Sequence, residues 1–290
     1  MPSLRDIKRR IRSVKSTQQI TKAMEMVAAA KLRKAQSRAE RARPYAEKME
    51  LILSNLSATV VPAGEQVLHP YFEERPVRKT TLVLLTSDRG LCGSFNSNLI
   101  RRAAIFLKDY TPQNGELVCI GKRGYTWYKK RPHPVVAHHE DFGGNMDFGR
   151  VRQITQELTQ RFISGETDVI YLLYSKFITT ARSEITLTRY LPIEAGASAR
   201  AGEARADYIF EPDPAAIFAD LMPRYITAKM QTAMAESFAA EHAARMMAMG
   251  GATKSAGEMI DSLTLQFNKA RQAAITKELL DIVGGAEALV

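Results

Sequence analysis

Each end of this chain carries a hydrophobic stripe with a period of 3.5 residues, and this feature constrains the fold more than any other. The N-terminal stripe begins at Leu4, and thirteen of its sixteen positions are apolar. Its positions are Leu4, Ile7, Ile11, Val14, Gln18, Thr21, Glu25, Ala28, Leu32, Ala35, Ala39, Ala42, Ala46, Met49, Leu53 and Leu56. A heptad sustained over this length predicts a left-handed coiled coil, and its central alanines predict a close partner helix. About 55 helical residues span roughly 80 Å, which is too long for a compact core, so we expect a shaft or an arm.

The C-terminal stripe begins at Leu221, and again thirteen of its sixteen positions are apolar. Its positions are Leu221, Tyr225, Ala228, Thr232, Ala235, Ala239, His242, Met246, Met249, Thr253, Ala256, Ile260, Leu263, Phe267, Ala270 and Ala274. Asp213 followed by Pro214 is typical of a helix start. The simplest way to bury both stripes is to pack the two helices antiparallel, with the longer C-terminal helix projecting beyond the pair. Pro44 and Pro223 should each bend their helix, because a proline ring clashes with the carbonyl four residues earlier.

The middle of the chain, about residues 77–210, has a different pattern, in which apolar strands alternate with amphipathic helices. The expected strands are 80–86, 117–121, 135–138, 168–177 and 184–193, and the expected helices are 96–110, 124–130 and 147–163. This alternation predicts a mostly parallel α/β sheet with Rossmann-like winding. Residues 194–206 have the composition of a mobile loop.

The fold predicted from these patterns is an antiparallel coiled coil of long N- and C-terminal helices with an inserted Rossmann-like α/β domain. The expected divisions are an N-terminal shaft helix (1–57), an α/β foot domain (77–210) and a C-terminal shaft helix (211–290).

Positive charge is concentrated at the N-terminus. The net charge is +10, and all of the excess lies in residues 1–48, which hold 14 Lys and Arg against four acids. The basic helix could bind nucleic acid, although no recognisable binding motif accompanies it. It could be a transit peptide, although the heptad continues far beyond a cleavable segment. It could also be a shaft that passes acidic protein surfaces.

Composition excludes several classes of protein. Apolar residues make up 45% and charged residues 25% of the chain, which is typical of a globular protein and not of a disordered one. Two cysteines, Cys92 and Cys119, are too few for a disulfide scaffold. No apolar run approaches the roughly 20 residues that span a bilayer, and the first residues lack the apolar core of a signal peptide. We therefore expect no direct membrane insertion.

The sequence offers little for catalysis. Residues 87–93 (SDRGLCG) follow the first expected strand, where α/β sheets bind ligands, but they lack the glycine spacing of a dinucleotide site. Residues 121–124 (GKRG) indicate a turn, and 138–141 (HHED) a solvated strand end without metal-ligand spacing. Cys92 is expected to be a small buried side chain, and His242 a core histidine with a satisfied hydrogen bond. We predict no catalytic residue, no cofactor and no metal site.

Four segments resemble the gamma subunit of bacterial F-type ATP synthase. They are residues 17–32 (TQQITKAMEMVAAAKL), 87–93, 241–246 (EHAARM) and 268–286 (NKARQAAITKELLDIVGGA). The resemblance covers essentially the whole chain in order. It implies a central-stalk rotor, in which the coiled coil is a shaft inside a ring of alternating α and β subunits. The α/β domain would be a foot bound to the epsilon subunit and to the membrane ring of c subunits.

The resemblance also implies roles for particular residues, none of them catalytic. Contacts with the β subunits are implied for Lys22, Met24, Lys31, Asp88, Arg89, Cys92, Arg271 and Gln272, shaft coupling for Arg245, and contacts with epsilon and the c ring for Asp207, Tyr208 and Glu211. The nucleotide sites of the family lie on the ring, so the chain would be a non-catalytic subunit of an H⁺-transporting ATPase. The resemblance implies a peripheral location on the cytoplasmic face of the bacterial inner membrane, without nucleic acid or cofactor.

The sequence departs from the family pattern at a few positions, and three other functions stay open. Gly250 and Gly251 lie inside the long C-terminal helix, where each costs about 1 kcal/mol relative to alanine, so the shaft should be softer there. Gly284 should fray the last turn, and the thiol switch of chloroplast relatives should be absent. Three alternatives stay open: an α/β enzyme with helical arms, a nucleic-acid-binding coiled coil and a self-associating scaffold.

Overall fold

The computed structural model describes residues 3–60, 69–193 and 214–287. Predictions made for the loop 194–206, the N-cap at Asp213 and the contacts of Asp207, Tyr208 and Glu211 lie outside these residues. Contacts divide the chain into Met1–Ala28 with Met246–Val290, here called the helical unit, and Ala29–Arg245, here called the sheet unit. The sheet unit thus includes helical segments that the sequence assigns to the shaft, and the predicted domain limits stay a prediction.

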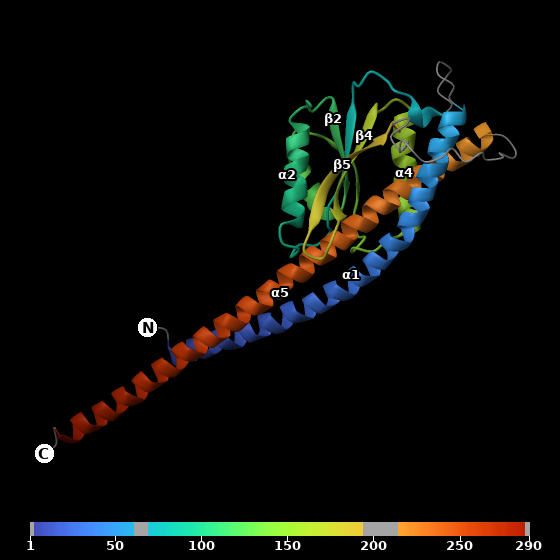
Figure 1. The fold of residues 1–290 in the computed structure, drawn as a ribbon. Helices are drawn as coiled ribbons and strands as arrows, with labels where there is room; N and C mark the ends of the chain where they lie inside the picture. The colour runs from blue at the N-terminus through green and yellow to red at the C-terminus, as the bar shows by residue number, and fades with distance from the viewer. Residues whose placement is uncertain (1–2, 61–68, 194–213, 288–290) are drawn as a thin grey trace. The chain divides into compact units, whose positions relative to one another are not determined.

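Two long helices, α1 (Leu4–Val60) and α5 (Pro214–Glu287), contribute to both units (Figure 1). In the helical unit they run antiparallel. The Oγ1 of Thr253 donates to that of Thr21 at 2.8 Å, and a Cβ placed on Gly257 would lie 3.2 Å from Nε2 of Gln18. Every position of the N-terminal stripe from Leu4 to Ala28 is buried or half-buried. The predicted antiparallel packing of the two stripes is confirmed in this unit.

The C-terminal part of α5 extends past the residues that α1 accompanies. The register between Thr21 and Thr253 brings Leu4 opposite residues near 270 of α5. Beyond that point the side chains of Leu279 and Ile282 are 58% and 68% exposed. The projecting end that the sequence predicts is therefore present, and it carries apolar side chains at its surface.

Helix breakers do not interrupt the long helices. The backbone is helical through Pro44 in α1 and through Pro223 and the Gly250–Gly251 pair in α5. A Cβ on Gly250 would lie 3.5 Å from Cδ of Glu25, an ordinary contact, and one on Gly251 would meet nothing within 4 Å. Alanine therefore fits at both glycines, and their effect on the helix is through backbone freedom. The predicted bends and the softer shaft stay predictions.

The sheet unit contains a five-stranded sheet in the order β3–β2–β1–β4–β5. The strands are β1 (Thr80–Leu85), β2 (Gly115–Ile120), β3 (Val135–His139), β4 (Val169–Phe177) and β5 (Ser183–Leu191), and the helices are η1 (Pro70–Phe72), α2 (Phe95–Leu107), α3 (Lys122–Tyr128) and α4 (Phe148–Ile163). The strands β1 to β4 are parallel, and β5 is antiparallel to β4. The predicted mostly parallel α/β fold is confirmed, and each strand and helix lies within about three residues of its predicted limits.

The two faces of the sheet are covered by different helices, and Figure 1 shows α2 and α4 on opposite sides of it. Because side chains alternate along a strand, Leu82 and Leu84 of β1 pack with α2 and α3, whereas Val83 and Leu85 pack with α4 and α5. The residues of α5 in this second core are Met222, Ile226, Met230, Ala233, Met234 and Phe238. The first half of α5 is therefore a core helix of the sheet unit.

A buried ion cluster lies at the amino ends of the parallel strands. The carboxylate of Glu116, whose side chain is 1% exposed, lies 2.8 Å from Nζ of Lys79 and 2.7 Å from Nη2 of Arg161. Thr81 donates a further hydrogen bond to it at 2.7 Å. Burial raises the pKa of Glu116, but the hydrogen bonds from Lys79, Thr81 and Arg161 outweigh burial and hold the pKa below its usual value.

Replacing Glu116 with Gln should lower the free energy of unfolding by about 3 kcal/mol, because two cations then lose their buried counter-charge. Since the native pKa of Glu116 lies below the unfolded value, its contribution is full above about pH 4.5 and is lost as the pH falls. Urea denaturation at pH 7 and pH 3.5 measures both effects. The matched control is Glu166→Gln, which removes the partly exposed partner of the same Arg161 and should cost less than about 1 kcal/mol. Equal losses in both variants would contradict the proposed role of burial.

Candidate functional site

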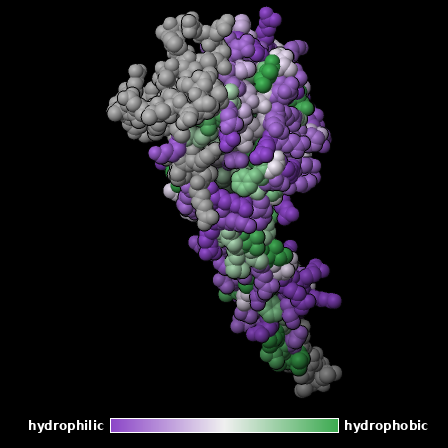
Figure 2. Space-filling view, turned by 90° about the vertical axis from the view of Figure 1, so that its right-hand side faces the viewer, coloured by the Kyte–Doolittle hydropathy of each residue, from purple (hydrophilic) through white to green (hydrophobic). Residues whose placement is uncertain are grey.

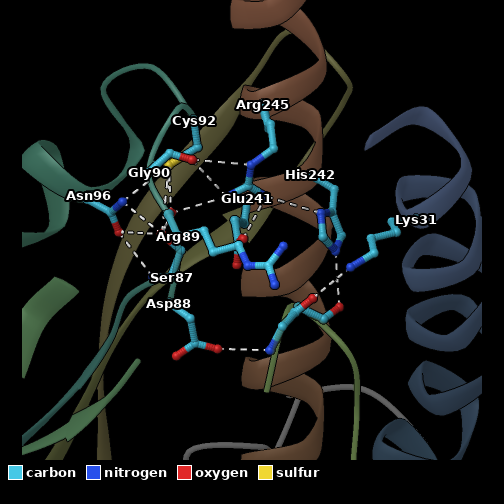
Figure 3. A network of polar contacts seen from close by, with 12 residues as sticks. Lys31, Ser87, Asp88, Arg89, Gly90, Cys92, Asn96, Glu241, His242 and Arg245 are labelled. Atoms are coloured by element: carbon cyan, nitrogen blue, oxygen red, sulfur yellow. Dashed lines mark hydrogen bonds and ion pairs between the residues drawn. The ribbon is translucent and has the colours of Figure 1, made fainter. Parts of the chain in front are cut away.

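The loop at residues 87–93, which follows β1, has a fixed conformation. The amide of Asn96 at the start of α2 accepts a hydrogen bond from the Ser87 backbone N–H at 3.0 Å and donates to the Ser87 Oγ at 2.8 Å. The same amide Nδ2 lies 3.2 Å from Sγ of Cys92 (Figure 3). Leu91 has a φ of 61°, in the left-handed region that is unfavourable for a branched residue, and its side chain is 62% exposed. The loop thus turns Cys92 inward and Leu91 outward.

A second loop, residues 141–144, meets the first through Asp88. The Asp88 carboxylate accepts backbone hydrogen bonds from Asp141 at 3.1 Å and from Gly143 at 2.8 Å. Asp141, Gly143 and Gly144 all have a positive φ, which turns their backbone groups toward Asp88 and α5. A Cβ on Gly144 would lie 2.4 Å from Nε2 of His242, so only glycine allows this approach.

Three side chains of α5 complete the network, which we call the polar joint (Figure 3). Nη1 of Arg245 donates to Oε1 of Glu241 at 2.7 Å, and Nη2 donates to the backbone carbonyls of Arg89 and Gly90 at 3.2 and 3.3 Å. His242 lies 3.0 Å from the Gly144 carbonyl through Nε2. One guanidinium therefore links a buried carboxylate on its own helix to the loop after β1.

The contacts of His242 require a neutral imidazole. A carbonyl only accepts, so Nε2 carries the hydrogen, and Nδ1 lies 3.4 Å from the Arg245 guanidinium, which only donates. Burial lowers the pKa of His242 to about 4, with the charges of Arg245 and Lys31 acting in the same direction. The predicted core histidine with a satisfied hydrogen bond is confirmed.

The pKa of Glu241 also depends on burial and on a neighbouring charge. Burial raises the pKa of Glu241, and the guanidinium of Arg245 opposes this effect. Lys31 on α1 reaches the other side of the joint, where its Nζ donates to the Gly143 carbonyl at 3.0 Å. The polar joint therefore connects α1, α5 and two loops of the sheet within one unit.

This arrangement is suited to holding elements of the sheet unit together. Burial raises the pKa of the Cys92 thiol, which disfavours the reactive thiolate. His139 and His138 point to opposite faces of β3, where His139 meets Glu157 of α4 at 3.2 Å and His138 stacks on Tyr125 of α3. Among the residues that the structure describes, no group of three or more His, Cys, Asp or Glu could hold a metal ion.

The structure brings together some of the residues singled out in the sequence. Lys31, Asp88, Arg89 and Arg245 meet in the polar joint. Cys92 lies beside it but is 1% exposed, whereas the side chains of Arg89 and Leu91 in the same loop are exposed.

The other described residues singled out in the sequence belong to the helical unit. Lys22 is exposed and forms an ion pair with Glu25 at 3.3 Å, and Met24 is half-buried. Arg271 and Gln272 are exposed on α5.

Sequence reasoning missed Asn96, Gly143, Gly144 and the pairing of Glu241 with Arg245. The adjacent glycines 143 and 144 are the one signal that could have indicated a backbone turned by positive φ. Their contact with His242 joins positions 98 residues apart, which no local pattern reveals.

Comparison with known proteins identifies the class. A protein-family model described as ATP synthase matches residues 3–289, which makes the chain an ATP synthase subunit. The ATP synthase gamma chain of Moorella thermoacetica is 45% identical over 289 residues, and that of Anaeromyxobacter dehalogenans is 44% identical over 295 residues. Each alignment covers 100% of both chains. The chain belongs to the ATP synthase gamma chain family, as the resemblance implied.

Solved structures agree with this assignment. A chain of the central stalk and c-ring structure of Tetrahymena thermophila mitochondrial ATP synthase is 25% identical with a TM-score of 0.61, covering 80% of this chain and 99% of that one. A chain of the Euglena gracilis mitochondrial enzyme, at 18% identity and a TM-score of 0.67, shares the fold over 99% of this chain and 94% of that one. As a gamma chain, this protein is a rotor subunit of the central stalk. No helix in the described part of the chain is both long and apolar enough to cross a membrane.

Replacing His242 with Gln should change how stability depends on pH. The variant keeps a donor for the Gly144 carbonyl but does not titrate. Native His242 stays neutral down to about pH 4, whereas in the unfolded chain it takes up a proton near pH 6.5. The unfolded state binds more protons in this window, so acidification from pH 7 to pH 5 should cost the wild type about 2 kcal/mol relative to the variant.

Urea denaturation of both proteins at the two pH values measures this difference. Glu241, whose raised pKa acts in the opposite direction, is present in both proteins and cancels. The prediction would be contradicted if wild type and variant differed in unfolding free energy by the same amount at pH 7 and pH 5. His242 would then take up a proton as readily in the native state as in the unfolded chain.

Proposed function

We propose that this chain couples rotation of a c ring to the conformations of three catalytic β subunits while catalysing no reaction itself. Its helices would turn as one shaft inside a ring of alternating α and β subunits. The observation that carries the proposal is the match to gamma chains over the full length of both sequences. The antiparallel helix pair supports it, since a narrow pair can turn inside a ring.

The surface of the helical unit suits a shaft that moves past its surroundings. Ile20, Met26, Val27 and Met247 are each more than half exposed, and Figure 2 shows such apolar surface among hydrophilic side chains along these helices. Apolar contacts are non-directional, so they can slide without breaking hydrogen bonds. The cation Lys22 would pass acidic loops of the β subunits through exposed, screened Coulomb contacts.

The projecting end of α5 supports a specific contact with a β subunit. Arg271 and Gln272 are exposed, in the region where α1 ceases to accompany α5. An arginine fork can hold a carboxylate bidentately, and a neighbouring Gln adds a donor and an acceptor. Beyond them, the exposed Ile275, Leu279 and Ile282 would fill an apolar sleeve at the top of the ring.

The sheet unit would act as the foot. We infer that Asp207, Tyr208 and Glu211 contact the epsilon subunit and the c ring, as the family resemblance implies. Arg245 would couple the shaft to the loop 87–93, and its hydrogen bonds to Arg89 and Gly90 support that role. The complex would place the chain on the cytoplasmic face of the bacterial inner membrane, where it is peripheral, and it would act without cofactor or nucleic acid.

Reconstitution tests the proposal. Separately purified α and β subunits are mixed with and without the chain, and ATP hydrolysis and the composition of the complex are measured. One copy per ring together with increased hydrolysis is the expected result. A chain that neither co-elutes with the ring nor alters hydrolysis would refute the proposal, and a saturable substrate or DNA titration on the chain alone would favour an enzyme or a nucleic-acid-binding coiled coil.

The double variant Arg271→Ala with Gln272→Ala should reduce coupling without disturbing the fold, because both side chains are exposed. Losing a charge-assisted contact of roughly 1.4 kcal/mol should lower ATP synthesis by about tenfold. Proton-driven ATP synthesis in reconstituted vesicles gives the rate, and circular dichroism checks the fold.

Lys277→Ala is the matched control, since it removes an exposed cation from another side of the same helix. Its synthesis rate should equal that of the wild type. A double variant that synthesises ATP at the wild-type rate would contradict the predicted contact.

A further inference from the structure

The outer surface of α2 and α3 contains a groove in which Cys92 is the one lining residue with a role implied by the family resemblance. It is open, has a volume of about 810 Å³, and runs between the two helices from the loop 90–93 to Arg131. Both helices pack on the face of the sheet opposite α4, and Figure 1 shows α2 on that side. The groove is lined by no residue of α1 or α5.

The charge of the groove is entirely positive. Arg101 of α2, Arg123 of α3 and Arg131, which follows α3, line it, and none of its thirteen lining residues is acidic. Among the described residues, the side chains of Arg101 and Arg123 have no hydrogen-bond or ion-pair partner. Two arginines facing one groove without counter-charges repel each other, and an anionic partner would relieve this repulsion.

The floor and rim of the groove are apolar. Trp127 is 44% exposed and is held in place by the Arg131 guanidinium, which lies 3.7 Å from the centre of its ring system. Ile100 and Ala104 lie one turn apart on α2 and form the opposite wall. Leu91 closes one end, exposed on a backbone of positive φ that costs free energy in the folded chain. A strained residue that presents an apolar side chain at a groove is typical of a binding surface.

We propose that this groove binds an acidic amphipathic helix of a protein partner. The α2 helix has 13 residues, about 20 Å, so a partner helix of three to four turns matches its length. The apolar side chains of such a helix would cover Ile100, Trp127 and Leu91, and its carboxylates would pair with Arg101 and Arg123. Peptide recognition by a helix in a groove uses this combination of an apolar stripe and flanking charges.

Two other anionic ligands fit the groove less well. A nucleotide would bury its base against an aromatic face, but the Arg131 guanidinium already lies over Trp127. An anionic membrane surface is flat, whereas the apolar groups here line a concave groove between two helices. The concave shape, the apolar lining and two arginines without a side-chain partner in the described part of the chain together favour the helix.

Trp127 makes a direct test possible, because it is the only tryptophan in the chain. The probe is an 18-residue peptide with leucines at i, i+3, i+4 and i+7 spacing and glutamates elsewhere. Titration into the full-length chain should shift Trp127 emission to shorter wavelength with saturation. The double variant Arg101→Glu with Arg123→Glu should weaken binding by about tenfold or more.

Matched controls separate a site from general electrostatics. Arg102→Glu changes a neighbouring exposed arginine of α2 outside the groove and should retain nearly full affinity. A peptide of the same composition in scrambled order should bind at least about tenfold more weakly than the amphipathic one.

Three results would overturn the proposal: equal binding of the two peptides, equal loss in the Arg102 and groove variants, or a Trp127 response to ATP or to anionic phospholipid vesicles but not to the amphipathic peptide. The test uses the chain alone, so its outcome is independent of assembly with α and β subunits.

Discussion

The burial on all sides of one segment of α5, residues 233–243, is the constraint on which the rest of the structure depends. All residues from Ala233 to Ala243 are buried, which a helix achieves only when it is enclosed by other elements. Five of these eleven are alanines, at positions 233, 235, 239, 240 and 243, and small side chains allow neighbouring elements to approach closely. Glu236, Glu241 and His242 are enclosed with them, so each needs a hydrogen-bonding environment inside the protein.

The conformations of the surrounding loops follow from that constraint. His242 can reach a carbonyl only because Gly144 has a positive φ and no Cβ. Arg245, one turn later on α5, pairs with the buried carboxyl group of Glu241. The remaining N–H groups of Arg245 donate to the carbonyls of Arg89 and Gly90 and so hold the loop in place. Asp88 ties the two loops together through backbone N–H groups. The polar joint therefore supplies the hydrogen-bond partners that the buried polar side chains of α5 require.

The elements of this fold could be predicted from the sequence because their signals are local. Heptad spacing identified the buried stripe positions, such as Ile7, Thr21 and Ala256, and apolar runs identified the strands. The antiparallel direction of β5 was not predicted, because an apolar run does not record direction. Lys31 and Gly143 are 112 residues apart, and their hydrogen bond depends on how α1 packs on the sheet unit. The groove beside Trp127 depends likewise on the spacing of two helices, which the sequence of neither helix specifies.

The two units hold α5 by different means, and this difference matches what a rotor requires. In the sheet unit, polar contacts fix α5 against sliding: Tyr190 donates to the Ile226 carbonyl at 2.9 Å, Lys229 donates to the Arg189 carbonyl at 2.7 Å, and the polar joint adds more. In the described part of the helical unit, Thr253 to Thr21 is the one side-chain hydrogen bond between α1 and α5. Torque applied to the sheet unit thus acts on α5 through directional bonds, whereas the helical unit relies mainly on packing. A helix pair with few directional bonds can adapt as its neighbouring subunits change. The energy of apolar packing changes gradually with displacement, whereas a hydrogen bond is lost once its geometry is disturbed.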